Sequence, residues 1–504
     1  MTARCACCRV ADRSREVPVR PKLRLLADDL ITRILDEARE ILSTLGVEIH
    51  NDAVVTLLGD HGAQVDREAG RVRIPGTLVD RALESAPSGF RLYDALGQET
   101  HDLSGDRVYF TPGSAAINLL DPESGEMRRP TTADYIRFVK LVTALPHVAS
   151  QSTAFIPADV PERISDSYRL YLSLRHGVKP VVTGAFTIEA FEVMKDLQVA
   201  VRGSGEALAE KPLTVFSCCP TAPLKWSDVT SQNLLDCAAY GIPVEYISMP
   251  LSGFMAPVTL VGTLVQHTAE TLSGLVISQL AQPGAPALYG GSPAIFDVRY
   301  ETTPMGAVET QMIDCAYAEI GKHLGLPTQA YIGLSDAKQL DAQAGIESAM
   351  GATLATLAGI NNISGPGMLD FESCQSLEKL VVDNEICGML LRLAEGIVPR
   401  DDFPARPLFE EMLREGHMLI AKHSRTHLRS EHYFPGATID RAQRSRWQDE
   451  GARTLRQRAH GEVERLIAAD TGPVLAAETL RALEDLMVAE ARRHGLERLP
   501  AEEN

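Results

Sequence analysis

The sequence has few aromatic residues and no long uninterrupted apolar run. Aromatic side chains make up 5% of its 504 residues. The longest apolar segment, Val258–Leu280, is interrupted by Gln266, His267 and Glu270, which makes it a poor membrane span. Residues 1–22 include basic side chains but no apolar stretch of the kind found in secretory signals. We therefore expect a cytoplasmic protein without a membrane segment.

Basic residues are outnumbered by acidic ones. Lys and Arg number 49 against 67 Asp and Glu, which gives a formal net charge of −18. No basic stripe interrupts this excess, so nucleic acid is not an expected partner. The nine cysteines lack paired spacing, which favours reduced thiols over disulfides. Cys5, Cys7 and Cys8 have no fourth ligand beside them, and the sequence predicts no metal site.

Several catalytic motifs are absent. No G-x-S-x-G elbow, H-E-x-x-H pair or His-x-Cys zinc pattern occurs, which argues against a serine hydrolase and against catalytic zinc. No G-x-G-x-x-G follows a strand-like run, which disfavours a doubly wound dinucleotide-binding sheet. These absences leave the reaction class open.

The chain does contain a regular alternation of strand-like and helical segments. Most strand-like runs are separated by helical patterns such as AVETQMIDCAYAEIGKHLGLP, which ends at Gly325 and Pro327. Eight β-then-α units over about 280 residues predict a (β/α)₈ TIM barrel, an α/β fold. The β-prone runs are 107–111, 148–155, 180–185, 213–218, 243–248, 287–291, 329–333 and 361–365.

The rest of the chain is expected to surround this barrel. We predict a disordered tail at 1–25, an N-terminal helix-rich region at 26–106, the barrel at 107–394 and a C-terminal helical extension at 395–504. A hairpin around 116–130 should lengthen the first crossover. The charged helices of the extension should pad the barrel or form an oligomer contact, and we expect a homo-oligomer.

Candidate site residues lie where predicted strands end, because barrel enzymes build their sites there. In the sixth unit Gly290, Gly291 and Ser292 would let the backbone approach a cofactor or other ligand, unless the run is only a tight turn. In the fifth unit the helix start at Thr259 could bind an anion or could simply be capped.

The seventh and eighth units are the most polar. Residues 331–343 are rich in polar side chains. Such a segment usually forms an exposed loop with a solvated ion pair, but its position after a barrel strand favours a functional role. Ser364 and Gly365 in the eighth unit could hold a phosphate or a cofactor side chain. The catalytic candidates in the seventh unit are Asp336, Asp341 and Gln343.

Four stretches resemble one protein family. The block from 328 to 383, together with GFMAPVTLVGTLVQ, LYGGSPAIFDVR and EHYFPGATIDRAQRSRW, is similar to the trimethylamine methyltransferase family, and the likeness covers most of residues 25–470. The resemblance implies a (β/α)₈ barrel that moves a methyl group from an amine nitrogen to the Co(I) of a separate corrinoid protein. The cobalamin would then come with that partner, and no cofactor would be tightly bound by this chain.

The resemblance also bears on the substrate. The founding members carry pyrrolysine in the loop that reads DAQAG here, where Ala344 occupies the equivalent position. Without that residue the chain resembles the non-pyrrolysine branch, whose members act on glycine betaine and related quaternary amines. Loss of a methyl group from a quaternary nitrogen leaves a neutral tertiary amine, so no further activation is needed. Ala344 should face the cavity and leave room for such a substrate.

A quaternary ammonium offers no hydrogen-bond donor, so aromatic faces and carboxylates should bind it. Asp297, Asp336 or Asp341 could balance the charge, and a betaine carboxylate would need a cation or free amide groups. The proposed substrate ligands are Tyr289, Tyr331, Phe254, Phe296, Lys338 and Arg299. Two other classes stay open: a barrel enzyme of different chemistry, such as a lyase or a corrinoid-independent methyltransferase, and a binding protein without turnover.

Overall fold

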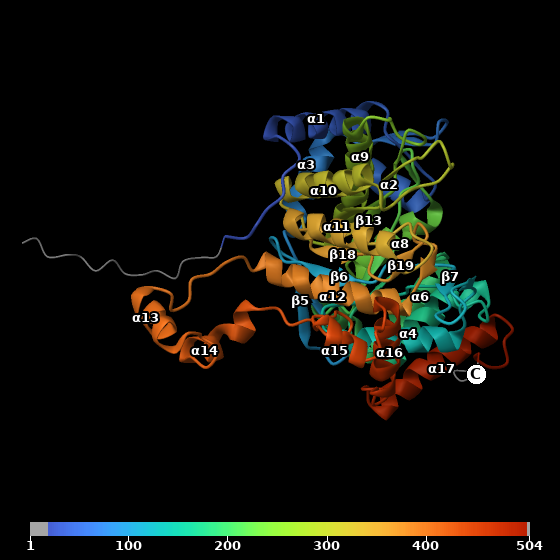
Figure 1. The fold of residues 1–504 in the computed structure, drawn as a ribbon. Helices are drawn as coiled ribbons and strands as arrows, with labels where there is room; N and C mark the ends of the chain where they lie inside the picture. The colour runs from blue at the N-terminus through green and yellow to red at the C-terminus, as the bar shows by residue number, and fades with distance from the viewer. Residues whose placement is uncertain (1–18, 501–504) are drawn as a thin grey trace, which may run out of the picture.

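Eight parallel strands close into a barrel. The computed structural model describes residues 19–500 and is shown in Figure 1. Two sheets, ordered β15-β13-β11-β10-β9 and β17-β18-β6, supply the wall. A parallel bridge between Tyr289 and Thr328 joins β15 to β17, and the Ala149 N–H donates to the Phe110 carbonyl at 2.8 Å, which joins β9 to β6. The barrel is therefore closed, and the predicted fold is confirmed.

All eight predicted strand runs contain a barrel strand. The strands are β6 (Tyr109–Thr111), β9 (Gln151–Ser152), β10 (Val181–Thr183), β11 (Thr214–Cys218), β13 (Val244–Ser248), β15 (Ala287–Gly291), β17 (Gln329–Tyr331) and β18 (Asn362–Ser364).

A ring of helices covers the outside of the barrel. Several begin at the capping residues that their sequences favour: Thr131 forms a capping box with Asp134, and Asp341 accepts from the amides of Gln343 and Ala344. Gly359 ends one of them in a left-handed conformation. The ring comprises α4 (Thr132–Ala144), α5 (Ser165–His176), α6 (Ile188–Arg202), α8 (Asp228–Tyr240), α9 (Leu260–Ala281), α10 (Val308–His323), α11 (Ala342–Ala358) and α12 (Leu377–Ala394), with α7 (Gly205–Glu210) and the short 3₁₀ turn η1 (Glu162–Ile164) between them.

The N-terminal region packs on one side of this ring. Its helices α1 and α3 lie against α9, and β1 pairs with β12, a two-residue strand between β11 and α8. The hairpin β4–β5 continues into the barrel floor, where Leu92 and Leu103 pack against Val182, Val215 and Leu288. The elements are α1 (Asp28–Thr44), β1 (Val47–Ile49), α2 (Asp52–Asp60), β2 (Gln64–Asp66), β3 (Arg71–Arg73), α3 (Gly76–Ser85), β4 (Arg91–Tyr93), β5 (Glu99–Asp102) and β12 (Lys225–Trp226).

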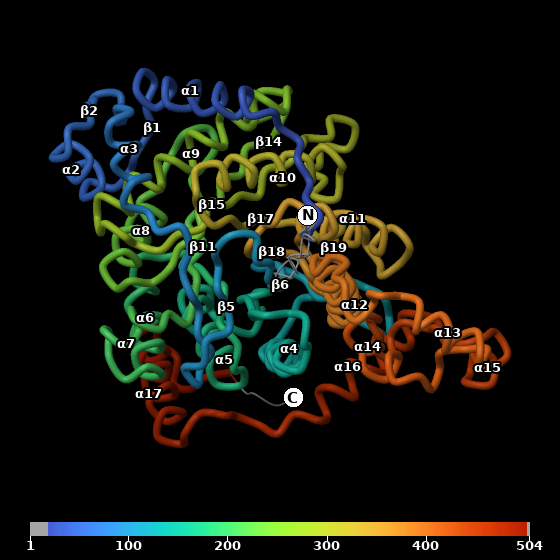
Figure 2. The backbone as a smooth tube through the Cα atoms, turned by 90° about the vertical axis from the view of Figure 1, so that its left-hand side faces the viewer, coloured from blue at the N-terminus to red at the C-terminus, as the bar shows by residue number. Residues whose placement is uncertain are grey.

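The C-terminal extension has two parts. Helices α16 and α17 pack on α12, α4, α5 and α6 (Figure 2). Helices α13 and α14 stand away from the barrel in Figure 1, and the end of α14 is attached to α12, where Arg392 donates to the Glu431 carbonyl at 3.2 Å. The elements are α13 (Arg406–Glu415), α14 (Lys422–Glu431), α15 (Arg444–Asp449), α16 (Leu455–Ala468) and α17 (Ala477–Arg493).

Small strands in the βα loops cover the carboxyl end of the barrel. A four-stranded sheet of order β19-β20-β7-β8 forms above β6 and β18, and β14 pairs with β16 beside it. The pair β7–β8 is the hairpin predicted in the first crossover. These strands are β7 (Asn118–Leu120), β8 (Met127–Arg128), β14 (Leu251–Ser252), β16 (Ala294–Ile295), β19 (Met368–Leu369) and β20 (Cys374–Gln375).

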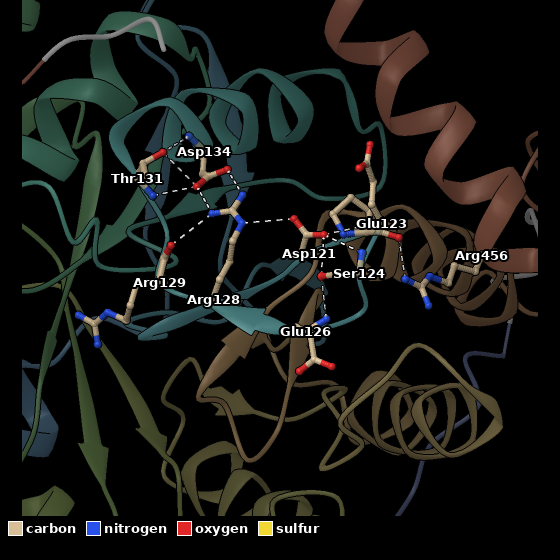
Figure 3. A network of polar contacts seen from close by, with 10 residues as sticks. Asp121, Glu123, Ser124, Glu126, Arg128, Arg129, Thr131, Asp134 and Arg456 are labelled. Carbon is tan, nitrogen blue, oxygen red and sulfur yellow. Dashed lines mark hydrogen bonds and ion pairs between the residues drawn. The ribbon is translucent and has the colours of Figure 1, made fainter.

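A network of polar contacts fixes the β7–β8 hairpin to the helices (Figure 3). Arg128 makes two hydrogen bonds of 2.7 Å to the Asp134 carboxylate at the start of α4. Asp121 accepts from the Ser124 amide at 2.9 Å, which closes the turn, and Arg456 of α16 donates to the Pro122 carbonyl at 2.7 Å. The loop sheet is thereby tied to both the barrel and the C-terminal extension.

The predicted 1–25 tail is partly ordered. Residues 1–18, including Cys5, Cys7 and Cys8, lie outside the described residues. From Arg20 onward the chain runs along the barrel helices, where Arg20 donates to the Thr356 carbonyl at 2.9 Å and the Leu23 amide donates to the Leu357 carbonyl at 2.9 Å. Hydrogen bonds to distant backbone carbonyls, which have no sequence signature, hold this stretch. No helix within 19–500 is long and apolar enough to span a membrane.

Candidate functional site

The barrel lumen contains a buried carboxyl group, that of Glu245 on β13. Ser217 donates to it at 2.7 Å and Asn362 at 3.2 Å. Since β13 and β18 are not neighbours in the barrel, the contact with Asn362 crosses the interior. Thr111 on β6 donates to Asn362 at 2.8 Å and extends the network. Burial raises the pKa of Glu245 to about 7, although the two hydrogen bonds act to lower it.

A second carboxyl group, that of Glu372, reaches the same region from the loop between β19 and β20. The pKa of Glu372 is raised to about 8, mainly by burial and further by the nearby Glu245, against a hydrogen bond from the Ser114 amide. Its Oε1 atom has no hydrogen-bond partner among the described residues. A Cβ atom added at Gly113 would lie 3.2 Å from this oxygen, so only a glycine leaves it uncrowded.

The backbone that carries Glu372 is strained. Asp370, Phe371 and Glu372 have φ values of 50°, 56° and 71°, a left-handed conformation that non-glycine residues adopt at a cost of about 1–3 kcal/mol each. Lys338 holds this turn from outside, with its Nζ atom 3.3 Å from the Asp370 carboxylate and 3.7 Å from the Phe371 ring centroid. Such strain persists where surrounding contacts demand it, and here it directs Glu372 into the lumen.

Tyr331 and Gln329 on β17 complete the acidic lumen. The Tyr331 hydroxyl lies 2.8 Å from Ser114 Oγ, and burial raises its pKa, with further contributions from Glu245 and Glu372. Gln329 accepts from the Gly291 amide at 3.1 Å, while its Nε2 atom has no partner in the described chain. Cys219, which follows β11, is close enough for both glutamates to raise the pKa of its thiol, after the larger effect of burial.

The charges in this site are of one sign. Neither Glu245 nor Glu372 forms an ion pair with a lysine or arginine of residues 19–500, and no cation contributes to the pKa of either group. Burying two carboxyl groups without a cation is costly, so the site is suited to a ligand that supplies positive charge. The same residues form no metal site, since no group of three or more His, Cys, Asp and Glu side chains in 19–500 could hold an ion.

Three of the residues predicted from the sequence lie at this lumen: Tyr331, Gly290 and Ser364. A Cβ atom at Gly290 would come within 2.4 Å of Gln329 Oε1, so the glycine is required there. Asn362 Nδ2 lies 3.5 Å from Ser364 Oγ, which places Ser364 beside the acidic network. Their roles as substrate and cofactor ligands stay predictions.

Tyr289 lies on the other side of the barrel wall. Its hydroxyl donates to Thr268 of α9 at 3.2 Å, and its ring lies beside His267 and Tyr317. Side chains alternate across a strand, so Tyr289 points outward because its neighbours Leu288 and Gly290 point inward. This placement argues against the predicted contact between Tyr289 and a substrate.

The predicted ligands in the fifth and sixth loops lie at the rim. Phe254 and Phe296 stack on each other at a centroid distance of 4.9 Å, with Phe254 exposed. Arg299 is also exposed, and its guanidinium is paired with Asp297 at 2.5 Å. These side chains lie outside the acidic lumen. Because the Arg299 guanidinium is already paired with Asp297, it is not available to bind the carboxylate of a substrate in the lumen.

Three predicted cofactor ligands, Gly291, Gly365 and Ser292, are part of the hydrogen-bonded and packed barrel wall. A Cβ atom at Gly291 would meet His267 Nε2 at 2.4 Å, so Gly291 faces α9 and not the lumen. The Gly365 amide donates to the Thr111 carbonyl at 3.1 Å, and the Ser292 amide donates to the Ser248 carbonyl at 3.0 Å. Close packing therefore accounts for these residues without a cofactor.

The polar loop of the seventh unit is largely structural. Asp336 accepts from the Met305 and Gly306 amides, each at 2.9 Å, and burial raises its pKa to about 6. Lys338 pairs with Asp370, as described above. Asp341 caps α11, and Gln343 donates to Glu347 at 2.9 Å on the exposed face of that helix. The groups predicted to be catalytic, Asp336, Asp341 and Gln343, are therefore engaged in hydrogen bonds that hold the loop and the start of α11.

Ala344 does not face the lumen. Its side chain is buried in a small apolar cluster with Leu120, Ala337, Leu369 and Cys374. The prediction that it opens a cavity for the substrate is therefore wrong, because α11 turns this position toward the loop sheet. The acidic lumen, and not Ala344, is therefore the feature of the structure that bears on the substrate.

The two glutamates were missed in the sequence. Glu245 lies in the mostly apolar run PVEYIS. Because barrel strands are buried on both faces, an acid in such a run could have indicated a functional carboxyl group in the lumen. Glu372 follows the eighth strand by eight residues in a loop without a recognisable motif. Only the left-handed turn brings it back over the barrel.

These features define a TIM-barrel protein with a buried acidic site at the carboxyl end of its strands. The profile described as "MTTB: Trimethylamine methyltransferase (MTTB)" matches residues 5–495, and the chain belongs to this trimethylamine methyltransferase family.

Its relatives include two named methyltransferases. Trimethylamine methyltransferase MttB of Desulfitobacterium hafniense (strain DSM 10664 / DCB-2) is 30% identical over 460 residues, which are 91% of this chain and 92% of that one. Glycine betaine methyltransferase of Desulfitobacterium hafniense (strain Y51) is 30% identical over 479 residues, covering 95% and 99%. Among solved structures, the Methanosarcina barkeri monomethylamine methyltransferase MtmB matches with a TM-score of 0.48 and 11% identity, covering 94% of this chain and 89% of that chain.

Proposed function

We propose that this protein transfers a methyl group from a quaternary amine to the Co(I) of a separate corrinoid protein. The observation that carries the proposal is the pair of buried carboxyl groups, Glu245 and Glu372, beside Tyr331 and without a cation. A quaternary ammonium supplies the missing positive charge and needs no hydrogen-bond acceptor. The family's named relatives act on trimethylamine and on glycine betaine, which supports amine demethylation.

The residues of the lumen would bind and orient the substrate. Glu372 and Glu245 would balance its charge, and the Tyr331 ring would face its methyl groups. The corrinoid supplies the nucleophile for the methyl carbon, and a neutral tertiary amine leaves with the electron pair of the broken C–N bond. This chain then needs only to align one N–CH₃ bond with the barrel mouth and to exclude water.

The partner would approach from the carboxyl end of the barrel, where the strand ends and the site meet. No tightly bound cofactor is required of this chain. We further propose a homo-oligomer of this chain as the working form.

An assay with free Co(I) cobalamin tests this function. The purified protein is incubated with a panel of quaternary amines, trimethylamine and no amine, and the absorbance of methylated cobalamin is followed. We expect methylation with at least one quaternary amine and negligible methylation with trimethylamine. Tight binding of an amine without methylation, also when a cognate corrinoid protein is supplied, would replace the proposal with a binding protein.

A further inference from the structure

We infer that the lumen selects a quaternary ammonium alcohol, of which choline is the simplest, over a betaine that carries a carboxylate. This inference rests on the proposed function and narrows its substrate class. Choline and glycine betaine share the trimethylammonium group and differ only where one has a hydroxymethyl group and the other a carboxylate. The residues around that end of the molecule should therefore decide between them.

The first argument is the sign of the charge in the lumen. In glycine betaine the carboxylate is one methylene group from the nitrogen, so a cation held by Glu372 and Glu245 brings the carboxylate close to them. Like charges at such a distance repel strongly in a buried site. A hydroxyl group carries no charge and avoids this repulsion.

The second argument is the pairing of three cations, Lys338, Arg299 and Arg169. Lys338 donates to the Asp336 carbonyl at 2.7 Å and pairs with Asp370, on the outer side of the strained turn. Arg299 pairs with Asp297 at the exposed rim. Arg169 is buried, but its guanidinium is bound to Asp166 at 2.8 Å and to the Thr153 carbonyl at 2.9 Å. Each of these cations is already engaged by an acid.

The third argument is the set of unpaired polar atoms. Glu372 Oε1 is an acceptor without a donor, and Gln329 Nε2 is a donor without an acceptor, within the part of the chain that the structure describes. A hydroxyl group both donates and accepts, so it can serve either atom. A carboxylate only accepts and would leave Glu372 Oε1 facing another anion.

Binding of a matched pair of ligands tests the inference. Calorimetry on the full chain at pH 8 compares choline with glycine betaine, with tetramethylammonium as the reference cation. We expect choline to bind at least ten-fold more tightly than glycine betaine. In Glu372→Gln the affinity for choline should fall at least ten-fold while that for glycine betaine stays or rises, and Glu309→Gln on the exposed start of α10 is the control.

The outcomes separate the two proposals. Equal or tighter binding of glycine betaine overturns the selection of an alcohol and leaves quaternary-amine transfer standing. Failure of every quaternary cation to bind or to be demethylated refutes the proposed function itself. Unchanged choline affinity in Glu372→Gln removes Glu372 from the site and overturns the inference.

A different observation carries a second inference, which concerns α13 and α14. We define the segment from Phe403 to Glu431 as the arm; its helices α13 and α14 project from the body in Figure 1. No residue of α13 or α14 is buried. Phe409 and Leu413, one turn apart on α13, are 58% and 79% exposed, and Ile420 in the same arm is 67% exposed. A helix of this length is marginal in water unless a partner covers its apolar face.

We infer that a second copy of this chain covers the arm. Helix α13 carries three acids, two of which pair with arginines of the same helix: Glu410 with Arg406 and Glu415 with Arg414. Helix α14 carries Lys422, Arg425 and Arg429 against the single acid Glu431. In a two-fold dimer the α13 of each copy meets the α14 of the other, so a helix with three acids and two arginines faces a helix with three basic residues and one acid twice. The apolar stripe would be enclosed between the charged pairs.

Sedimentation velocity tests the dimer at micromolar protein concentration. The full chain should be dimeric, and Phe409→Glu with Leu413→Glu should be monomeric at unchanged melting temperature, with the exposed Val474→Glu as the control. Charge reversal of Glu410 and Glu411 to Arg in one chain, and of Arg425 and Arg429 to Glu in another, should abolish each homodimer and restore a mixed dimer. A monomeric native chain, or a dimer that survives the double substitution, overturns the arm contact.

Discussion

The floor and the upper part of the barrel lumen are built from the same strands but from opposite kinds of side chain. On β11, Val215 packs into the apolar floor, while Ser217, two residues further along, donates to Glu245. On β15, Leu288 belongs to the floor and Gly290 faces Gln329. Burial of apolar side chains stabilises the fold, whereas burial of carboxyl groups costs free energy. The upper lumen is therefore destabilised relative to the floor, as expected for a binding site.

The largest expected effect comes from the floor. Leu288→Ala should lower the free energy of unfolding by about 2–5 kcal/mol, because it leaves a cavity in a closed barrel. Chemical denaturation measures the change. At temperatures where the variant is folded, its affinity for a quaternary cation should equal that of the native chain. A loss of affinity without a loss of stability would contradict the division between floor and site.

In the upper lumen the expected pattern is reversed. Glu372→Gln should weaken binding of choline or tetramethylammonium by about 2 kcal/mol, or ~30-fold, because a desolvated charge is removed. Its stability should stay the same or rise, since a buried carboxyl group is lost. Calorimetry and thermal unfolding of the same preparation check both effects. Lower stability at unchanged affinity would assign Glu372 to the fold.

The pH dependence should follow the two raised pKa values, about 7 for Glu245 and about 8 for Glu372. Both exceed the ordinary glutamate value, so the folded state binds more protons and loses stability as pH rises toward 8. Affinity for a quaternary cation should increase over the same range, because the ligand does not titrate and the acids ionise. The two groups titrate as a coupled pair.

Binding constants for tetramethylammonium measured from pH 6 to pH 9, together with melting temperatures, test this opposition. Glu372→Gln should flatten the upper part of the affinity curve. Affinity that falls with rising pH would rule out an ionised carboxylate as the binding group.

The smallest effect should distinguish the two tyrosines on either side of the barrel wall. Tyr331→Leu should weaken cation binding by about 1 kcal/mol through loss of an aromatic face, and Tyr331→Phe should retain most of the affinity. Tyr289→Leu should change stability and leave affinity intact, because its ring packs between the wall and α9. Equal affinity losses in both Leu variants would show that the wall does not separate them.

Local patterns were enough to predict the barrel. Each strand run is short and followed by a helix, six of the eight ring helices begin at a capping side chain, and such units have one common way to close. The domain bounds at 107 and 394 stay a prediction; in the structure β6 begins at Tyr109 and α12 ends at Ala394. The ordering of residues 19–25 was missed because it depends on backbone contacts with distant helices.

Only part of the site could be predicted from the sequence. Tyr331, Gly290 and Ser364 were found because they end barrel strands, and that position is encoded locally. The direction of Tyr289, the burial of Ala344 against Leu120, and the pairing of Arg299 with Asp297 depend on strand register and on loop packing. A shift of one residue along a strand exchanges lumen and wall, and periodicity alone does not specify it.

The sequence by itself determined the fold class, the family and the excess of negative charge. Tertiary structure alone decided that two glutamates, 127 positions apart as the numbers 245 and 372 give, share one desolvated lumen. Their meeting requires barrel closure, which brings β13 and β18 to opposite sides of one interior, and a left-handed turn at 370–372 that no local propensity favours. Long-range geometry, and not residue type, therefore made the acidic site.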